Sequence, residues 1–141
     1  MQMNNVKKAL EELTLTEKFR QGNVRLNACP SRNVLKDVTS RWGVLVFLTL
    51  QQGTHRYSEL RHKINGVSEK MLTQTLHALE EDGFVLRTAH PVIPPHVEYS
   101  LTESGKEVAV RVEELVNWIE VNINSILTAK DEYAAAHNEA G

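Results

Sequence analysis

A mostly helical α+β fold with one β-hairpin is predicted by three features of this 141-residue sequence. Apolar residues recur at three- and four-residue steps over much of the chain, which is typical of amphipathic helices. Between residues 84 and 101 the pattern changes to the two-residue alternation of strands, interrupted by a proline-rich loop. After residue 102 the helical period returns. The predicted order is therefore helices, a hairpin and a terminal helix.

The first part of the chain is expected to form short helices separated by breaks. Residues 4–15 have helical spacing, and a new helix is expected at Pro30, because proline suits the first turn of a helix. The apolar run 42–52 fits either a buried helix or a central strand, and its length favours the helix. A brief extended piece is expected at residues 55–57.

Two helices joined by a short turn are predicted next. Ser58 is expected to cap a helix that ends at Asn65–Gly66. Ser68 is expected to cap the second helix, which ends at Gly83. A short turn between two such helices is typical of a helix-turn-helix.

The hairpin follows this pair directly. Residues 84–90 are expected to form one strand, 91–96 a loop stiffened by three prolines, and 97–101 the returning strand. A hairpin behind a helix-turn-helix is a wing, so residues 29–102 are predicted to form a winged helix-turn-helix domain.

The last part of the sequence predicts a dimer. Thr102 is expected to cap a helix over residues 103–130, whose apolar stripe is too long for one small domain to cover. We expect it to pack on a second copy of the chain, helped by an N-terminal arm over residues 1–28. The predicted homodimer interface comprises Leu10, Val112, Leu115, Ile119 and Ile123. A flexible tail is expected over residues 131–141.

Charge is unevenly distributed along the chain. The net charge is only −2, yet residues 18–70 hold ten basic and three acidic residues, whereas residues 103–141 hold three basic and eight acidic ones. The basic part can face a polyanion and the acidic part cannot. Solvated helix faces are the alternative explanation of this pattern.

A winged helix-turn-helix implies binding of double-stranded DNA, with its second helix in the major groove and basic side chains on phosphates. Gln74 can bond an adenine edge in two places, and the amides at Ser68 can hold a phosphate. The expected DNA contacts are Ser68, Lys70, Thr73, Gln74 and His77 on the second helix, Arg56, Arg61 and Lys63 before it, and Arg87, His90 and His96 on the hairpin.

Several short segments, in order and spacing, resemble the HxlR-type family of winged-helix transcriptional regulators. These segments are Cys29–Pro30, Arg41–Trp42, residues 56–60, 66–72, 79–83, 94–95 and 97–102. The resemblance implies a dimeric bacterial regulator that binds a palindromic operator, with terminal helices forming the dimer interface. His77, His90 and His96 stand where this family often has arginine, tyrosine and a basic residue. We therefore hypothesise weaker or pH-dependent DNA affinity.

Cys29 is a candidate sensor. It stands directly before Pro30 at a predicted helix start, where the helix dipole favours a thiolate. The resemblance implies the same role, since several family members respond to electrophiles or oxidants through a cysteine at this position. A small buried cysteine with no reactivity is the alternative. As the sequence has one cysteine, a disulfide must join two chains or a small thiol.

Other classes of function are disfavoured by the sequence. The six histidines lack the spacing of a zinc site, so no metal and no cofactor is expected. Patterns of phosphate loops, zinc proteases and nucleophile elbows are missing, so an enzyme is not expected. Neither a membrane span nor an export signal is found, which predicts a cytoplasmic protein. A winged helix that binds protein, or a regulator with a non-covalent small-molecule effector, stays an alternative.

Overall fold

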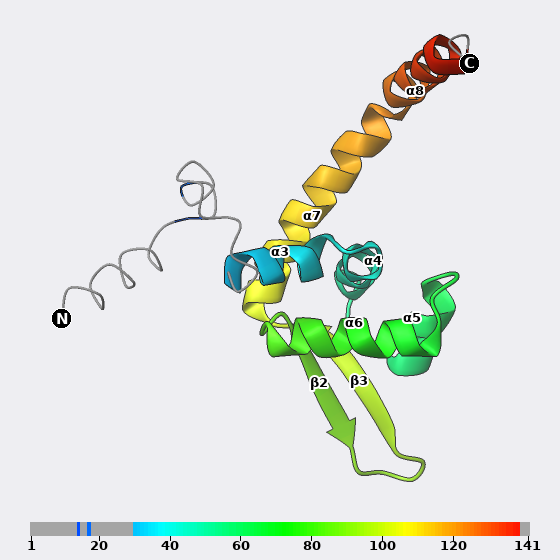
Figure 1. The fold of residues 1–141 in the computed structure, drawn as a ribbon. Helices are drawn as coiled ribbons and strands as arrows, with labels where there is room; N and C mark the ends of the chain where they lie inside the picture. Colours follow the sequence, from blue (N-terminus) through cyan, green and yellow to red (C-terminus); the bar gives the residue numbers. More distant parts are fainter. Residues whose placement is uncertain (1–13, 15–16, 18–29, 139–141) are drawn as a thin grey trace, which may run out of the picture.

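The computed structural model describes residues 14, 17 and 30–138 and confirms the winged helix-turn-helix fold (Figure 1). The helices in the described part are α3 (Pro30–Thr39), α4 (Arg41–Leu50), α5 (Tyr57–Lys63), α6 (Glu69–Glu81), α7 (Glu103–Val121) and α8 (Ile123–Asn138). The strands there are β1 (His55–Arg56), β2 (Val85–His90) and β3 (His96–Leu101). None of the helices in these residues is long and apolar enough to cross a membrane. The N-terminal arm over residues 1–28 lies outside the described part, apart from two residues.

The apolar run 42–52, which fitted either a helix or a strand, lies mostly in helix α4. Ser40 precedes it, and its hydroxyl accepts a hydrogen bond from the Gly43 amide at 3.1 Å. A side chain at Gly43 would meet the Asp37 carbonyl oxygen, because a Cβ there would lie 2.3 Å from it. This close approach lets α3 and α4 follow each other with one residue between them.

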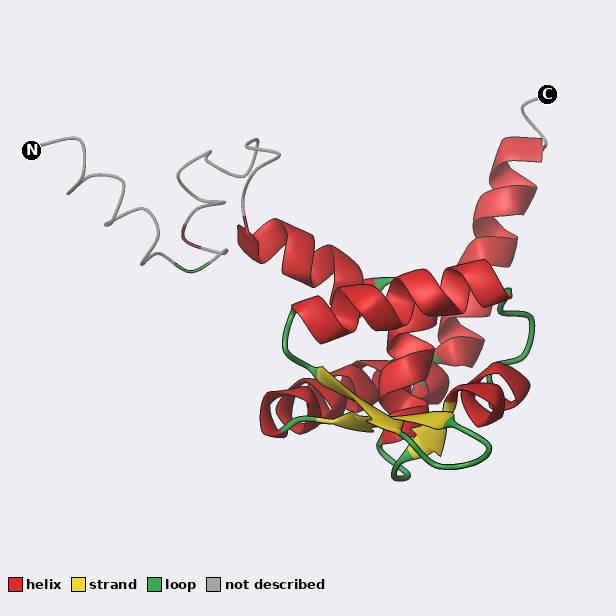
Figure 2. Ribbon diagram, turned by 90° about the horizontal axis from the view of Figure 1, so that it is seen from below, coloured by secondary structure: helices red, strands yellow, loops and turns green. Residues whose placement is uncertain are grey.

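The three strands form one small antiparallel sheet in the order β1-β3-β2 (Figure 2). The expected hairpin is confirmed, with His90 opposite His96 at its outer end. The extended piece at residue 55 adds a third strand, because His55 pairs with Tyr99. The wing is therefore tied at its base to the chain that leads into the helix-turn-helix.

The hydrophobic core lies between the helices and the inner face of this sheet. Its fully buried side chains include Val46 and Phe47 of α4, Leu60 of α5, and Leu72, Leu76 and Leu79 of α6. The rings of Phe47 and Phe84 pack at 5.9 Å between centroids. This core fixes which face of α6 points inward.

Two expectations about helix ends are wrong. Helix α5 begins at Tyr57, two residues earlier than Ser58 capping would allow, because the Glu59 carboxylate accepts a hydrogen bond from the Arg56 amide at 3.0 Å. It also ends at Lys63 rather than at Asn65–Gly66. The caps at Ser68 and Thr102 are confirmed. The Ser68 hydroxyl accepts a hydrogen bond from the Met71 amide, and the Thr102 hydroxyl accepts one from the Gly105 amide, each at 3.1 Å.

The C-terminal helix differs from the expected single helix over residues 103–130. It is interrupted at Asn122, whose side-chain amide donates to the Trp118 carbonyl at 2.8 Å. An asparagine that bonds the backbone in this way competes with the regular helical pattern. The expected flexible tail is helical up to Asn138, because its alanines at 134–136 are strong helix formers.

Candidate nucleic-acid interface

Helices α5 and α6 are held at a fixed angle by a tyrosine. The hydroxyl of Tyr57, in α5, donates to the Glu69 carbonyl at 3.1 Å and lies 3.1 Å from the Thr73 hydroxyl. The turn between the helices includes Gly66, whose φ of 86° is the left-handed region that glycine adopts freely. The helix-turn-helix is therefore a preformed unit, and Thr73 is partly engaged inside it.

Helix α6 has one buried and one exposed face, as expected. Lys70, Thr73, Gln74 and His77 are all on the exposed side. His77 is 3.0 Å from the Glu81 carboxylate one turn further along. Gln74 and Lys70 have no such partner within the described residues, so these two side chains are the ones free to meet a ligand.

The basic residues in front of α6 differ in how they are held. Arg61 lies 3.9 Å from the Glu69 carboxylate, and both side chains are at least half exposed. Arg56 is exposed at the end of β1. Such exposed cations can exchange an acidic neighbour for a phosphate at little cost in free energy.

Lys63 is bound to a buried histidine that the sequence analysis did not single out. His55 is 4% exposed, and its Nδ1 donates to the Gly53 carbonyl at 2.7 Å. Its Nε2 is then unprotonated and accepts from the Lys63 ammonium at 2.7 Å. Lys63 is thus positioned by the sheet, where the sequence alone showed only a basic side chain.

The wing brings together three side chains of which the sequence analysis named two. His90 and His96 are opposite each other on β2 and β3, and their rings stack at 4.7 Å between centroids. Glu98 accepts from His90 Nε2 at 3.0 Å and lies 3.3 Å from His96 Nε2. The hydrogen bond from His90 lowers the pKa of Glu98, and the nearby charges of both imidazoles add to this. The loop expected from the sequence included His96, so no register was available there to place Glu98 beside the two histidines.

Arg87, the remaining expected contact on the wing, is exposed on β2 opposite Tyr99. It therefore lies on the other face of the hairpin from the His90 and His96 pair, because successive residues of a strand alternate between faces. The two expected sets of wing contacts cannot meet one flat surface together.

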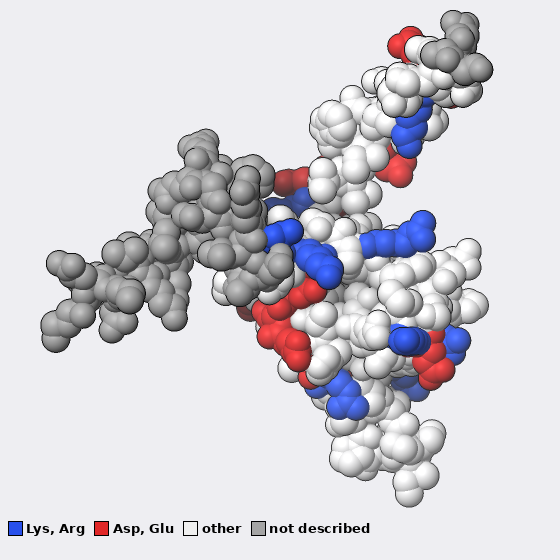
Figure 3. Space-filling view, viewed as in Figure 1, with Lys and Arg blue, Asp and Glu red and all other residues white. Residues whose placement is uncertain are grey.

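Basic side chains are dispersed among acidic ones over the visible face of the domain, rather than gathered in one patch (Figure 3). The tip of the wing, at the bottom of that view, lacks Lys and Arg, as residues 90–96 contain neither. A polyanion would therefore be held by scattered cations around α6.

An acidic cluster marks the far end of α6. Asp82 ends the helix, and its Oδ2 is buried with no hydrogen-bond partner among the described residues. Burial, followed by the neighbouring Asp37 carboxyl and then Glu81, raises the pKa of Asp82 from 3.8 to about 6. This end of the helix repels phosphates, so only the Ser68 end suits them.

Comparison with known proteins agrees with this geometry. A model of HxlR-like helix-turn-helix proteins matches residues 37–126. The HTH-type transcriptional regulator YtfH of Escherichia coli K12 is 55% identical over 126 residues, covering 89% of this chain and all of that protein. The solved structure of a regulator YtfH from Salmonella typhimurium has 56% identity and a TM-score of 0.72, covering 77% of this chain and 97% of its own. The chain belongs to the HxlR-like helix-turn-helix family.

Membership of this family makes the protein a winged-helix transcriptional regulator, and it implies DNA binding. A further similar solved structure is the redox regulator HypR in its oxidized form, at 35% identity and a TM-score of 0.61, covering 67% of this chain and 97% of that one. The matched family and these relatives are helix-turn-helix or redox regulators.

The residues expected at a dimer interface differ in how exposed they are in the structure. Leu115 and Ile119 are 55% and 39% exposed on α7, and Ile123 is half-buried at the start of α8. Val112 is instead 7% exposed within the core of its own protomer, because this first half of α7 packs on α4. Leu10 lies outside the described residues, as does the candidate sensor Cys29.

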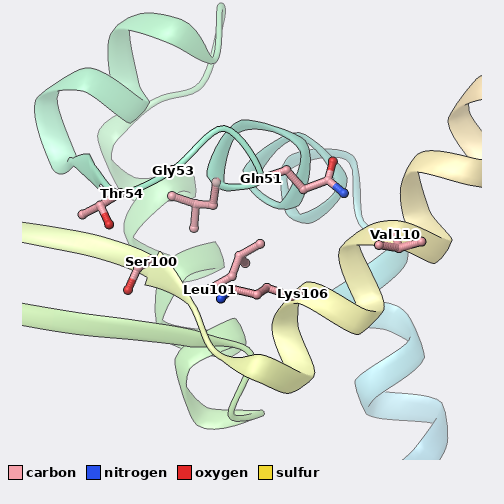
Figure 4. Close-up of a pocket in the computed structure, with 8 residues that line it drawn as sticks. Gln51, Gly53, Thr54, Ser100, Leu101, Lys106 and Val110 are labelled. Carbon is pink, nitrogen blue, oxygen red and sulfur yellow. The ribbon is translucent and has the colours of Figure 1, made fainter.

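Two of the hollows in the described part of the chain lie beside α7. One lies between the end of α4, the end of β3 and the first turns of α7, where Lys106 lines it (Figure 4). None of the expected site residues lines this hollow. The other is an apolar groove between α3 and α7, lined in part by Val34, Leu35 and Leu115. This groove continues into the exposed apolar side of α7.

Proposed function

We propose that this regulator binds a palindromic DNA operator as a homodimer, with α6 as the recognition helix of each protomer. The observation that carries the proposal is the exposed polar face of α6, on which Lys70 and Gln74 are free of partners in the described residues. Gln74 would read an adenine edge in the major groove, and Ser68 with the first amides of α6 would hold a phosphate.

The flanking groups would supply contacts that do not depend on base sequence. Arg56 and Arg61 are exposed beside α6, and Lys63 is held in place by His55. Exposed cations that meet phosphates release counterions, so each adds to the salt dependence of binding. The wing would place Arg87 on the backbone beside the major groove.

The dimer is supported by the apolar side chains that α7 and α8 leave exposed. Trp118 and Val121 are 60% and 84% exposed, and the C-terminal arm, formed by the second half of α7 and by α8, projects away from the domain (Figure 1). Two recognition helices in one dimer would meet half-sites about 34 Å apart, one turn of the double helix. Together these features favour a symmetric operator.

The test is a titration of the full chain against the DNA upstream of its own gene, followed by fluorescence anisotropy at several salt concentrations. We expect Gln74→Ala to lose about 1 to 3 kcal/mol of discrimination between operator and mutated operator. Arg61→Ala should weaken binding to all sequences and reduce the salt slope by about one.

Matched controls come from residues away from α6. Gln52→Ala, at the exposed end of α4, and Arg111→Ala, on α7, should leave affinity and salt slope as in the wild type. Equal affinities for all four variants would contradict the assignment of α6, and a lack of specific binding by the wild type would favour a winged helix that binds protein.

We also propose that Cys29 switches this binding when an electrophile or oxidant modifies it. The similarity to the redox regulator HypR supports this, together with the position of Cys29 directly before Pro30, where α3 begins. A thiolate at a helix start is stabilised by the helix dipole. Treatment with a thiol-specific electrophile should release the wild type from operator DNA and leave Cys29→Ser bound. If both proteins stay bound, Cys29 is structural.

A further inference from the structure

The outer end of the wing carries a group of three metal-binding side chains. His90, His96 and Glu98 each offer one ligand atom, and these atoms all lie within 4.8 Å of one another. His90 Nε2 is 3.0 Å from one Glu98 oxygen, and His96 Nε2 is 3.3 Å from the other. The three side chains therefore lie together, with the Glu98 carboxylate within 3.3 Å of both imidazoles.

We propose that His90, His96 and Glu98 bind a divalent transition-metal ion of the zinc class. In a tetrahedral zinc site, ligands at about 2.0 Å from the metal lie roughly 3.3 Å from one another. The observed separations between imidazole nitrogen and carboxylate oxygen, 3.0 and 3.3 Å, are close to that value. The three ligand atoms lie within 4.8 Å of one another, so side-chain rotation would bring them onto one ion. Two imidazoles and one carboxylate are a ligand set that zinc takes in proteins, with water in the fourth position.

The backbone holds the two imidazoles in place. His90 is the last residue of β2 and His96 the first of β3, and they are direct partners in the antiparallel register. Pro91 follows His90 and Pro95 precedes His96, so the backbone is restricted on the loop side of both histidines. A site whose ligands are fixed before binding loses less conformational entropy on binding.

Glu98 is placed by the same sheet. It is two residues after His96 on β3, so its side chain is on the same face of the strand. The three side chains are between 23% and 37% exposed, which leaves one side of the cluster open to solvent. An ion can therefore enter, and a water or an external oxygen can complete its coordination.

The chemistry of the ligands selects the class of ion. Magnesium and calcium prefer oxygen ligands, and one carboxylate beside two imidazoles offers too few. Imidazole nitrogen suits zinc, copper and nickel. Without an ion, His90 donates a hydrogen bond to the Glu98 carboxylate, and His96 lies 3.3 Å from its other oxygen. An ion that binds here would take the place of the imidazole proton, which is released to solvent.

The experiment is a zinc titration of the untagged full-length protein by calorimetry, with binding of Co²⁺ followed by its visible absorption as a measure of coordination. We expect one Zn²⁺ per chain and no heat from Mg²⁺ or Ca²⁺. His96→Gln and Glu98→Gln should each weaken zinc binding by at least about tenfold. Unfolding curves of the metal-free variants should match the wild type, which separates lost ligands from lost fold.

Two matched controls address other zinc ligands in the chain. His137→Gln, on the exposed end of α8, and Cys29→Ser should bind zinc as the wild type does. The proposal is overturned if His96→Gln binds zinc with wild-type affinity, or if Cys29→Ser or His137→Gln abolishes binding. None of these readouts involves DNA, so the proposed operator binding can fail or succeed independently.

Discussion

Many apolar side chains of the domain are buried, whereas many of those in the C-terminal arm are exposed. In the domain, Phe47, Leu60 and Leu76 are at most 2% exposed, although they come from three different helices. In the arm, Trp118 and Val121 are more than half exposed, although they belong to one regular helix. The domain completes its core alone, whereas among the described residues no surface covers the apolar side chains of the arm.

The change from one region to the other takes place inside α7. Ala109 and Val112 are buried against the domain, and from Leu115 onward the apolar side chains emerge. A soluble chain seldom exposes so many large apolar groups on one element without a partner. The difference between the regions therefore supports the proposed dimer through the second half of α7 and α8.

The largest expected effect comes from removing a core side chain of the domain. Phe47→Ala leaves a cavity in a site that is 0% exposed, so the free energy of unfolding should fall by about 3 to 5 kcal/mol. Urea unfolding followed by tryptophan fluorescence measures this. A loss below about 1 kcal/mol would mean that this core is not tightly packed.

A charge in the arm should act on assembly instead. Ile119→Glu places a carboxylate on the exposed apolar side of α7, and we expect the dimer to dissociate at concentrations where the wild type stays dimeric. Sedimentation velocity gives the mass, and the far-ultraviolet circular dichroism should stay the same. An intact dimer would contradict the interface. Glu120→Gln, its exposed neighbour, serves as the control.

A pH-dependent effect is expected at the end of α6. Because the pKa of Asp82 is raised to about 6 in the folded chain, the folded state holds a proton that the unfolded state releases. The free energy of unfolding therefore falls as pH rises from about 4 to 6. Asp82→Asn removes this penalty and should stabilise the protein by about 1 kcal/mol at pH 7.5, with no gain at pH 4.

Urea unfolding of both proteins at several pH values measures the difference. A gain that is the same at pH 4 and pH 7.5 would show that charge is not its cause. Glu80→Gln, on the exposed side of the same helix end, should give little change at either pH.

The smallest effect is expected for a truncation in the arm of the monomer. In an Ile119→Glu background, Trp118→Ala should change the free energy of unfolding by no more than about 0.5 kcal/mol, since the side chain is 60% exposed. The same type of truncation at Phe47 serves as its counterpart. If Trp118→Ala matched Phe47→Ala, the two regions would not differ in the way described.

The parts of the fold that were predicted from the sequence depend on local signals. Ser68 and Thr102 cap their helices, and Gly83 ends α6 with a φ of 82°, each within one turn of the residue concerned. The exposed polar face of α6 followed from its helical spacing. These features need no knowledge of distant residues.

The features that were missed depend on contacts across the fold. Val112 belongs to the same stripe as Leu115, and only the packing of α7 on α4 separates a core residue from an exposed one. The partner of Lys63 is His55, which is buried where β1 pairs with β3. Glu98 joins the two wing histidines only because the loop sets the register of the hairpin. Sequence spacing alone does not contain that information.

Asn122 separates α7 from α8, so the angle between these two helices is set at this residue. Helix α8 has 16 residues and spans about 24 Å, so a turn of about 10° at its base moves its tip by about 4 Å. In a dimer assembled through α8, this angle would set the distance between the two copies of α6, and with it the length of operator that both can span. Asn122 would then help to set the spacing between the two half-sites of the operator.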